Sequence, residues 1–128
     1  MEADGANLDR SKPRGFLRIW RAFGASARGF AGAVRDEAAF RQELCFAAVV
    51  IPLGLWLGRG PIERALLISP VLLILITELV NSAIEATVDR IGYERHALAG
   101  LAKDLGSAAV FMSFVLLGAV WLLILCGH

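Results

Sequence analysis

Several features that define common protein classes are missing from this 128-residue chain. It has no G-x-x-x-x-G-K-[ST] loop, which excludes a P-loop kinase, and it has no G-x-G-x-x-G fingerprint or zinc-spaced cluster. The net charge of +1 gives no basic field, so we expect no nucleic-acid partner. The two cysteines, Cys45 and Cys126, lie at opposite ends of the apolar region, and we interpret them as small apolar residues without a disulfide.

Apolar residues dominate the chain instead. They make up 57% of it, and the mean hydropathy of +0.63 is high for a soluble domain. We predict an all-α membrane protein, with a disordered tail over residues 1–12 and one domain over residues 13–128. In that domain we expect a surface helix at 13–35 and three transmembrane helices at 37–57, 63–88 and 105–126.

The segment before the first transmembrane helix mixes large apolar side chains with arginines, which indicates an amphipathic helix lying in the membrane interface. Three of its glycines, Gly24, Gly29 and Gly32, predict a break in this helix. Asp36 is expected to cap the next helix, with Glu37 in its first turn.

Further signals mark the transmembrane helices and their connections. Pro52 should kink the first transmembrane helix or remove one of its hydrogen bonds. Residues 89–104 are expected to form a polar loop. Asp104, at its end, is interpreted as a cap of the third transmembrane helix, as a ligand of a nucleotide hydroxyl, or as both.

The basic residues predict the orientation. Eight lysines and arginines precede residue 44 and three lie in residues 89–106, but only Arg59 and Arg64 lie between the first two transmembrane helices. By the positive-inside rule, the N-terminus and the second connection are expected to be cytoplasmic and the C-terminus outside.

The second transmembrane helix carries a polar stripe. Glu78, Asn81 and Glu85 stand three and four residues apart, so they share one face. A charge at the bilayer centre costs about 2.5–3.5 kcal/mol on insertion scales. The simpler interpretation is that the stripe only holds helices together. The free-energy cost of placing charged residues in the bilayer instead favours a role in chemistry at a membrane surface.

Acids of the first transmembrane helix should meet this stripe, because consecutive helices run antiparallel. We expect Glu37 to lie level with Glu85, where the pair could hold Mg²⁺ together with phosphate oxygens. Glu43 should lie level with Glu78, and Glu78, the deeper acid, suits a general base acting on a lipid hydroxyl. Lys103, in the second connection, could act as a point charge on a transferring phosphate.

The motif that carries the most information is ELVNSAIEATVDRIG at residues 78–92, supported by DEAAFRQE at 36–43 and AKDLGSAA at 102–109. These segments resemble the prokaryotic integral-membrane diacylglycerol kinases, whose relatives include undecaprenol kinase. The resemblance covers most of the chain after Gly15. It implies a homotrimer that transfers the γ-phosphoryl group of MgATP to the primary hydroxyl of diacylglycerol, giving phosphatidic acid and ADP.

The resemblance also implies roles for individual residues. Glu78 would be the catalytic base, oriented by Asn81, and Glu37 and Glu85 would be the Mg²⁺ ligands. Positions that match nucleotide contacts, besides those two metal ligands, are Arg18, Glu94, His96, Lys103 and Asp104. Positions that match the surroundings of the lipid, besides Glu78, are Arg18, Ala39, Gln42, Glu43, Ser107 and Trp121.

Two alternatives remain at this point. One is an undecaprenol kinase, which keeps the mechanism and changes the acceptor. The other is a membrane proton or ion relay subunit, because intramembrane acids also mark ion paths. The kinase is favoured over the relay because the outer half of the second transmembrane helix offers only Ser69 to continue a polar path. Three helices cannot both surround the stripe and shield it from lipid, which is a second reason to expect an oligomer.

Overall fold

The computed structural model describes residues 15–92 and 96–128. The predicted disordered tail at residues 1–12, and Glu94 with its neighbours Tyr93 and Arg95, lie outside the described residues. The described part forms four helices: α1 (Phe16–Asp36), α2 (Ala38–Leu57), α3 (Gly60–Ile91) and α4 (Ala97–Cys126). The chain divides into two compact units, residues 1–32 and 33–128, and α2, α3 and α4 belong to the second.

Helix α1 is continuous over its 21 residues, so the predicted break at Gly24–Gly32 is wrong. Each glycine in a helix costs about 1 kcal/mol relative to alanine. The glycines of α1, however, are surrounded by alanines and arginines. These strong helix formers offset that cost.

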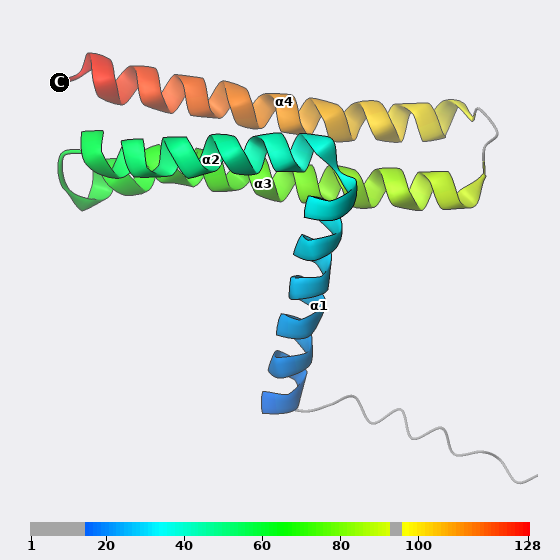
Figure 1. Ribbon diagram of the computed structural model, residues 1–128. Helices are drawn as coiled ribbons and strands as arrows, with labels where there is room; N and C mark the ends of the chain where they lie inside the picture. The colour runs from blue at the N-terminus through cyan, green and yellow to red at the C-terminus, as the bar shows by residue number, and fades with distance from the viewer. Residues whose placement is uncertain (1–14, 93–95) are drawn as a thin grey trace, which may run out of the picture. The chain divides into compact units, whose positions relative to one another are not determined.

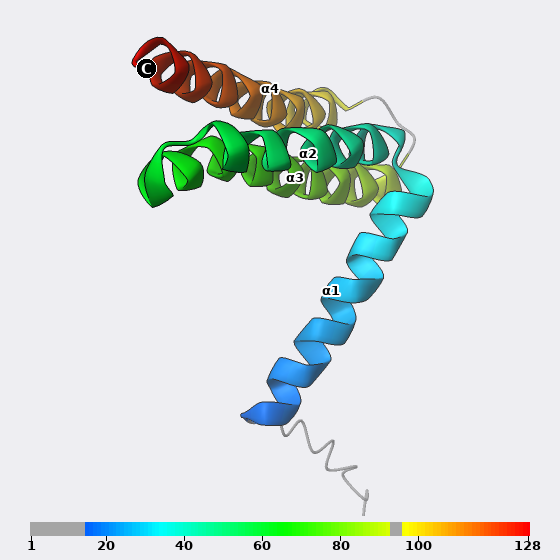
Figure 2. The same cartoon turned by 60° about the vertical axis from the view of Figure 1, so that its left-hand side comes forward.

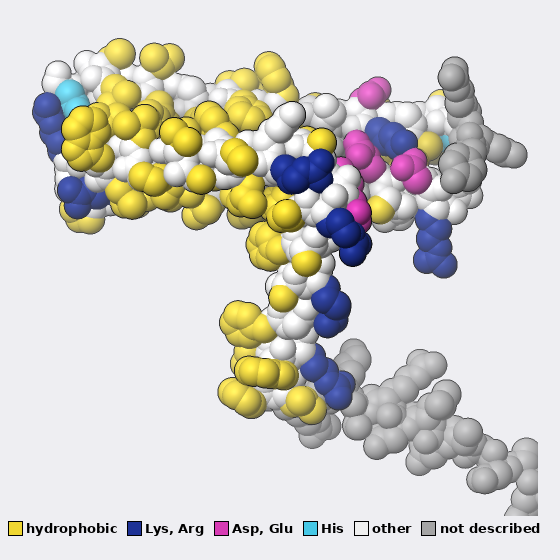
Figure 3. All heavy atoms as spheres, viewed as in Figure 1, with side chains coloured by type: hydrophobic (Ala, Val, Ile, Leu, Met, Phe, Trp, Pro, Cys, Tyr) yellow, Lys and Arg dark blue, Asp and Glu magenta, His cyan; other side chains and the backbone are white. Residues whose placement is uncertain are grey.

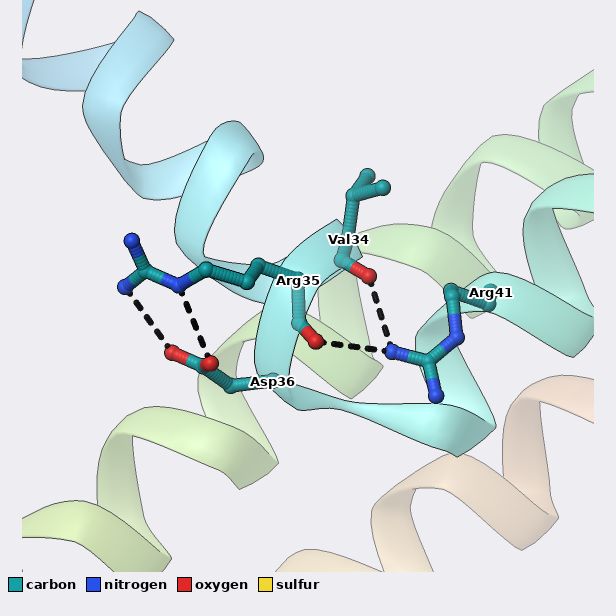
Figure 4. A network of polar contacts seen from close by, with 4 residues as sticks. All are labelled: Val34, Arg35, Asp36 and Arg41. Atoms are coloured by element: carbon teal, nitrogen blue, oxygen red, sulfur yellow. Dashed lines mark hydrogen bonds and ion pairs between the residues drawn. The ribbon is translucent and has the colours of Figure 1, made fainter.

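The junction of α1 and α2 is held by arginine side chains (Figure 4). Arg41 donates from one nitrogen to the carbonyl oxygens of Val34 and Arg35, both at 2.9 Å. Arg35 binds the carboxylate of Asp36 through two hydrogen bonds of 3.0 Å, which lower the pKa of that carboxyl. Because this carboxylate is engaged and Asp36 ends α1, the predicted cap is wrong, and the cap position of α2 is occupied by Glu37.

Helices α2, α3 and α4 are each long and apolar enough to cross a membrane. Helix α3 has 32 residues, about 48 Å at the usual rise of 1.5 Å per residue. Both α2 and α3 continue through an internal proline, Pro52 and Pro70 respectively. Each proline lacks the N–H that would complete one backbone hydrogen bond.

The connection between α3 and α4 is shorter than predicted. Helix α3 continues to Ile91 and α4 begins at Ala97, so most of the expected polar loop at 89–104 is helical. His96 occupies the cap position of α4, where its ring Nδ1 accepts the Leu98 N–H at 3.1 Å. Asp104 lies within the helix, and its prediction as a cap is therefore wrong.

The three long helices run antiparallel to their neighbours in sequence, and α3 packs against both α2 and α4 (Figures 1 and 2). The side chains with almost no exposed surface are Phe40 on α2 and Leu67, Val71 and Ile74 on α3. An aromatic pair, Phe46 and Phe114, joins α2 to α4 with ring centroids 6.1 Å apart. The small core therefore centres on α3.

Polar contacts fix the register of α3 against α4. These contacts recur along the length of the α3–α4 pair. An apolar interface alone would allow the two helices to slide past each other. From the α2–α3 turn toward the α3–α4 connection, they join the Trp121 indole N–H to the Leu67 carbonyl (3.0 Å), the hydroxyls of Thr77 and Ser113 (3.0 Å), and the Lys103 ammonium to Asp89 (2.7 Å).

Gly54 allows a close approach of α2 to the other two helices. A Cβ atom at this position would lie 3.2 Å from the Leu67 Cβ and 3.5 Å from the Trp121 ring. Gly54 is buried. The position therefore tolerates no large side chain.

We expect Gly54→Leu to destabilise the protein, because overpacking a tight contact costs about 1–3 kcal/mol. Thermal unfolding in detergent micelles, followed by circular dichroism, measures the effect. Gly29→Leu on α1 is the control, since a Cβ there meets no atom of the described residues within 4 Å. Equal melting temperatures for the two variants would contradict the prediction.

Candidate active site

A cavity of about 390 Å³ opens between α2, α3 and α4. Acidic side chains visible in Figure 3 gather over the part of the bundle near the α3–α4 connection, whereas the other end is mainly apolar. The residues that line the cavity are Glu37, Ala39, Glu78, Asn81, Glu85, Ser107, Val110, Phe111 and Phe114. It thus brings together six residues that the sequence singled out.

The helical spacing of α3 presents the three polar residues of the stripe to this cavity. Glu78 and Asn81 are 6% and 8% exposed, so the protein shields them almost completely. Asn81 donates from its side-chain nitrogen to Glu85 at 3.5 Å, a long contact. Glu37 and Glu85 lie close enough for their charges to act on Glu78.

Glu43 on α2 approaches Glu78 within hydrogen-bond reach, as the antiparallel arrangement predicts. Eleven residues separate Glu43 from Gly54 on α2, and eleven separate Leu67 from Glu78 on α3. Eleven residues make close to three helical turns. Gly54 and Glu43 therefore lie on one face of α2, and Leu67 and Glu78 lie on one face of α3. The buried Glu43 Oε2 has no hydrogen-bond partner among the described residues.

Lys103 supplies a positive charge close to this group of acids. Its ammonium is bound to Asp89 at 2.7 Å and is close enough to Glu85 for the two charges to interact. Asp104 is the next residue of α4 and is exposed. Both residues lie on the side of the cavity toward the α3–α4 connection.

The lining of this cavity does not include Trp121, Gln42 or His96, which the sequence also singled out. Trp121 is 14 residues from Ser107 along α4, about 21 Å, and packs near Gly54. Gln42 is exposed on α2, and Arg18 is exposed on α1, in the other compact unit. His96 lines a second hollow, of about 770 Å³, together with Val88, Ile91, Gly92, Leu98, Ala99 and Ala102.

Some contributors to the site were not predicted: Val110, Phe111 and Phe114 line the cavity, and Asp89 and Gly106 contact residues of the site. Phe111 is an ordinary apolar residue of a transmembrane segment by sequence, and nothing in the pattern marks it. Asp89 belongs to the conspicuous motif, but its partner Lys103 lies across the helix connection. The sequence could have indicated this ion pair, because the two residues carry opposite charges on either side of the short α3–α4 connection. Gly106, which packs against Asn81, has no signal beyond being a glycine inside a helix.

The cavity offers oxygen atoms, the donors that Mg²⁺ prefers. Glu37 and Glu85 provide carboxylates, and the side-chain oxygen of Asn81 is buried with no hydrogen-bond partner in the described part of the chain. Within residues 15–92 and 96–128, no three His, Cys, Asp or Glu side chains gather in a way that could hold a metal. This donor set fits a cation that shares its coordination sphere with a phosphorylated ligand and water.

Comparison with known proteins identifies the family. The family model for prokaryotic diacylglycerol kinase matches residues 24–125. A Pseudomonas aeruginosa protein named diacylglycerol kinase is 50% identical over 113 residues, covering 88% of this chain and 92% of the relative. Proteins of the same name from Escherichia coli K12 and Haemophilus influenzae are 47% and 46% identical, covering 89% and 86% of this chain and 93% of each relative. The chain therefore belongs to the prokaryotic diacylglycerol kinase family.

Proposed function

We propose that this protein is an ATP-dependent diacylglycerol kinase, which phosphorylates the primary hydroxyl of diacylglycerol and releases phosphatidic acid and ADP. The observation that carries the proposal is the cavity that places Glu37, Glu78 and Glu85 together between helices able to cross a membrane. Membership of the prokaryotic diacylglycerol kinase family supports phosphoryl transfer to a lipid as the reaction at this acidic cavity. An acceptor dissolved in the membrane and a donor dissolved in water can both reach it.

Glu78 is the catalytic base of the proposed reaction. It takes the proton from the primary hydroxyl while the hydroxyl oxygen bonds to the γ-phosphorus, and the bond from that phosphorus to the β,γ-bridging oxygen breaks. Asn81, one turn further along α3, orients the neighbouring acids. The near-complete burial of Glu78 supports this assignment, because little water competes for the proton.

Glu37 and Glu85 hold Mg²⁺ in this proposal. Bound there, Mg²⁺ supplies positive charge to the phosphate oxygens. Lys103 adds a point charge on the transferring phosphoryl group after leaving Asp89, its partner in this structure. The other nucleotide contacts are assigned to Arg18, Glu94, His96 and Asp104.

The lipid lies on the membrane side of the same cavity. Ala39 and Ser107 line it, and Glu43 approaches the base Glu78. These positions support a lipid hydroxyl that enters between α2 and α4. Arg18, Gln42 and Trp121 are assigned to more distant parts of the lipid.

We propose that the protein is a homotrimer. Only 6% of the most apolar stretch of α4 is buried, so this helix is free to meet other subunits as well as lipid. Glu37 and Glu85 are half-buried in a single chain. Partner subunits would complete the shielding that an intramembrane acid requires.

The proposed location is the bacterial inner membrane, with the N-terminus and the cavity cytoplasmic and the C-terminus outside. The distribution of basic residues supports this orientation. On α1, apolar side chains lie mainly along one side and arginines along the other (Figure 3). This arrangement supports an amphipathic helix lying at the membrane surface.

We expect Glu78→Gln to lower kcat by about 10²–10⁴-fold, because the variant lacks the base. Transfer of labelled phosphate from MgATP to diacylglycerol and, separately, to undecaprenol is measured in mixed micelles. Wild-type protein should label diacylglycerol. Label in undecaprenol instead would change the acceptor and keep the mechanism, and no transfer to either lipid by folded protein would refute the kinase.

We expect Glu85→Gln to raise the Mg²⁺ concentration for half-maximal rate by about 10–100-fold, the range typical for disturbed metal sites. Mn²⁺ binding in the presence of a non-hydrolysable ATP analogue, followed by electron paramagnetic resonance, gives a second readout. Glu63→Gln is the control, because the Glu63 carboxylate accepts the Arg59 N–H at the α2–α3 turn, away from the cavity. Equal Mg²⁺ dependence in both variants would argue against the assigned ligands.

Chemical cross-linking of the protein in native membranes should produce dimers and trimers and no larger species. The apolar surface of α4 is the expected contact. The control is the same reaction after dilution into denaturing detergent, where only monomer should remain. Monomer alone in membranes would contradict the trimer.

A further inference from the structure

Gly106 on α4 faces Asn81 on α3 at the edge of the cavity. It is buried, and a Cβ atom at this position would overlap the side-chain oxygen of Asn81 and lie 3.3 Å from its Cγ. The same Cβ would lie 3.6 Å from the terminal methyl group of Ile84. The missing side chain therefore leaves a notch in α4, and the carboxamide of Asn81 occupies it.

This notch is specific to one glycine of the helix. Gly100 and Gly118 also lie on α4, but a Cβ atom at either position meets nothing within 4 Å. Alanine at either position would meet no atom of the described residues within that distance. Among these three glycines of α4, packing therefore requires a glycine at Gly106, opposite Asn81.

Packing holds the Asn81 carboxamide more firmly than hydrogen bonds do. Its nitrogen makes the long 3.5 Å contact to Glu85, and its buried oxygen has no hydrogen-bond partner among the residues that the structure describes. An amide with so little polar support is oriented by the surface against which it lies. That surface is the backbone of α4 at Gly106.

The helices cannot easily move apart to admit a larger residue. The Thr77–Ser113 hydrogen bond lies seven residues from Gly106 in one direction along α4, and the Asp89–Lys103 ion pair lies three residues away in the other. In this structure these contacts join α3 and α4 on both sides of the notch, and the part-buried Thr77–Ser113 bond does not depend on the state of Lys103. A side chain at position 106 would therefore displace Asn81 before it displaced the helix.

We propose that Gly106 is a positioning residue, whose notch orients the Asn81 carboxamide and through it the carboxylate of Glu85. The inference rests on the proposed function, because it assigns Gly106 to the metal side of that site. An added methyl group would turn the carboxamide away from Glu85. The lipid side of the cavity, at Ala39, would be unchanged.

The kinetic test compares Gly106→Ala with Gly100→Ala and Gly118→Ala. We expect Gly106→Ala to lower kcat by about 10–100-fold, as small misplacements in active sites do. It should also raise the Mg²⁺ concentration for half-maximal rate and leave KM for diacylglycerol unchanged. In an Asn81→Ala background, which removes the group that is displaced, Gly106→Ala should cause no further loss of residual activity.

A spectroscopic test does not depend on activity. The chain has two asparagines, Asn7 and Asn81, so selective ¹⁵N labelling gives two side-chain amide pairs that Asn81→Ala distinguishes. Gly106→Ala should shift the Asn81 pair, whereas Gly100→Ala and Gly118→Ala should leave it in place. If wild-type protein has no kinase activity, the proposed function fails, and this spectrum still decides whether the notch holds Asn81.

Each outcome decides the inference. An unchanged Asn81 amide in Gly106→Ala overturns it, as does equal loss of activity with and without Asn81. If Gly106→Ala does not fold, the double variant Gly106→Ala/Asn81→Ala is examined. Recovery of folding shows that the added methyl group collides with Asn81 and supports the inference, and failure of both variants assigns Gly106 to general packing and overturns it.

Discussion

The antiparallel register of α3 against its two neighbours is the constraint on which the rest of the structure depends. Apolar helices in a membrane gain little from one register over another, because lipid tails are as apolar as leucine. Against α4, the register is set by three polar contacts spread along the pair. Against α2, it is set by the close approach at Gly54. Without these contacts, a shift of one residue would turn the acids of α2 and α3 away from each other.

The site is assembled from contacts that are far from it. The Gly54–Leu67 contact and the Glu43–Glu78 pair lie eleven residues apart on both helices, so packing near the α2–α3 turn determines which acids meet near the other end. Thr77 and Glu78 are adjacent on α3, and the hydroxyl of Thr77 binds α4 while the carboxyl of Glu78 approaches α2. Because Thr77 and Glu78 are adjacent, the position of α3 against α4 also determines how α3 meets α2.

The sequence predicted the parts of this arrangement that follow from periodicity and hydropathy. Long apolar runs indicated the three helices, and the spacing of Glu78, Asn81 and Glu85 indicated their common face. The errors came from competition between local interactions. Asp36 could have capped α2, but Arg35 binds its carboxylate, and the polar residues around Asp104 resembled a loop because hydropathy does not distinguish a loop from a helix that continues into water. The role of Gly106 depends on a neighbour on another helix, which no local pattern reveals.

The length of α3 has a consequence for how two poorly miscible reactants can meet. At about 48 Å it exceeds a hydrocarbon core of about 30 Å, so a helix of this length that crosses a membrane would also extend into water. In a membrane, such a helix would hold Glu78 and Glu85, which stand seven residues apart, at two different and fixed depths. A soluble phosphate donor and an oily alcohol could then be brought together at a fixed phase boundary, without a lid that closes or a domain that carries either reactant across it.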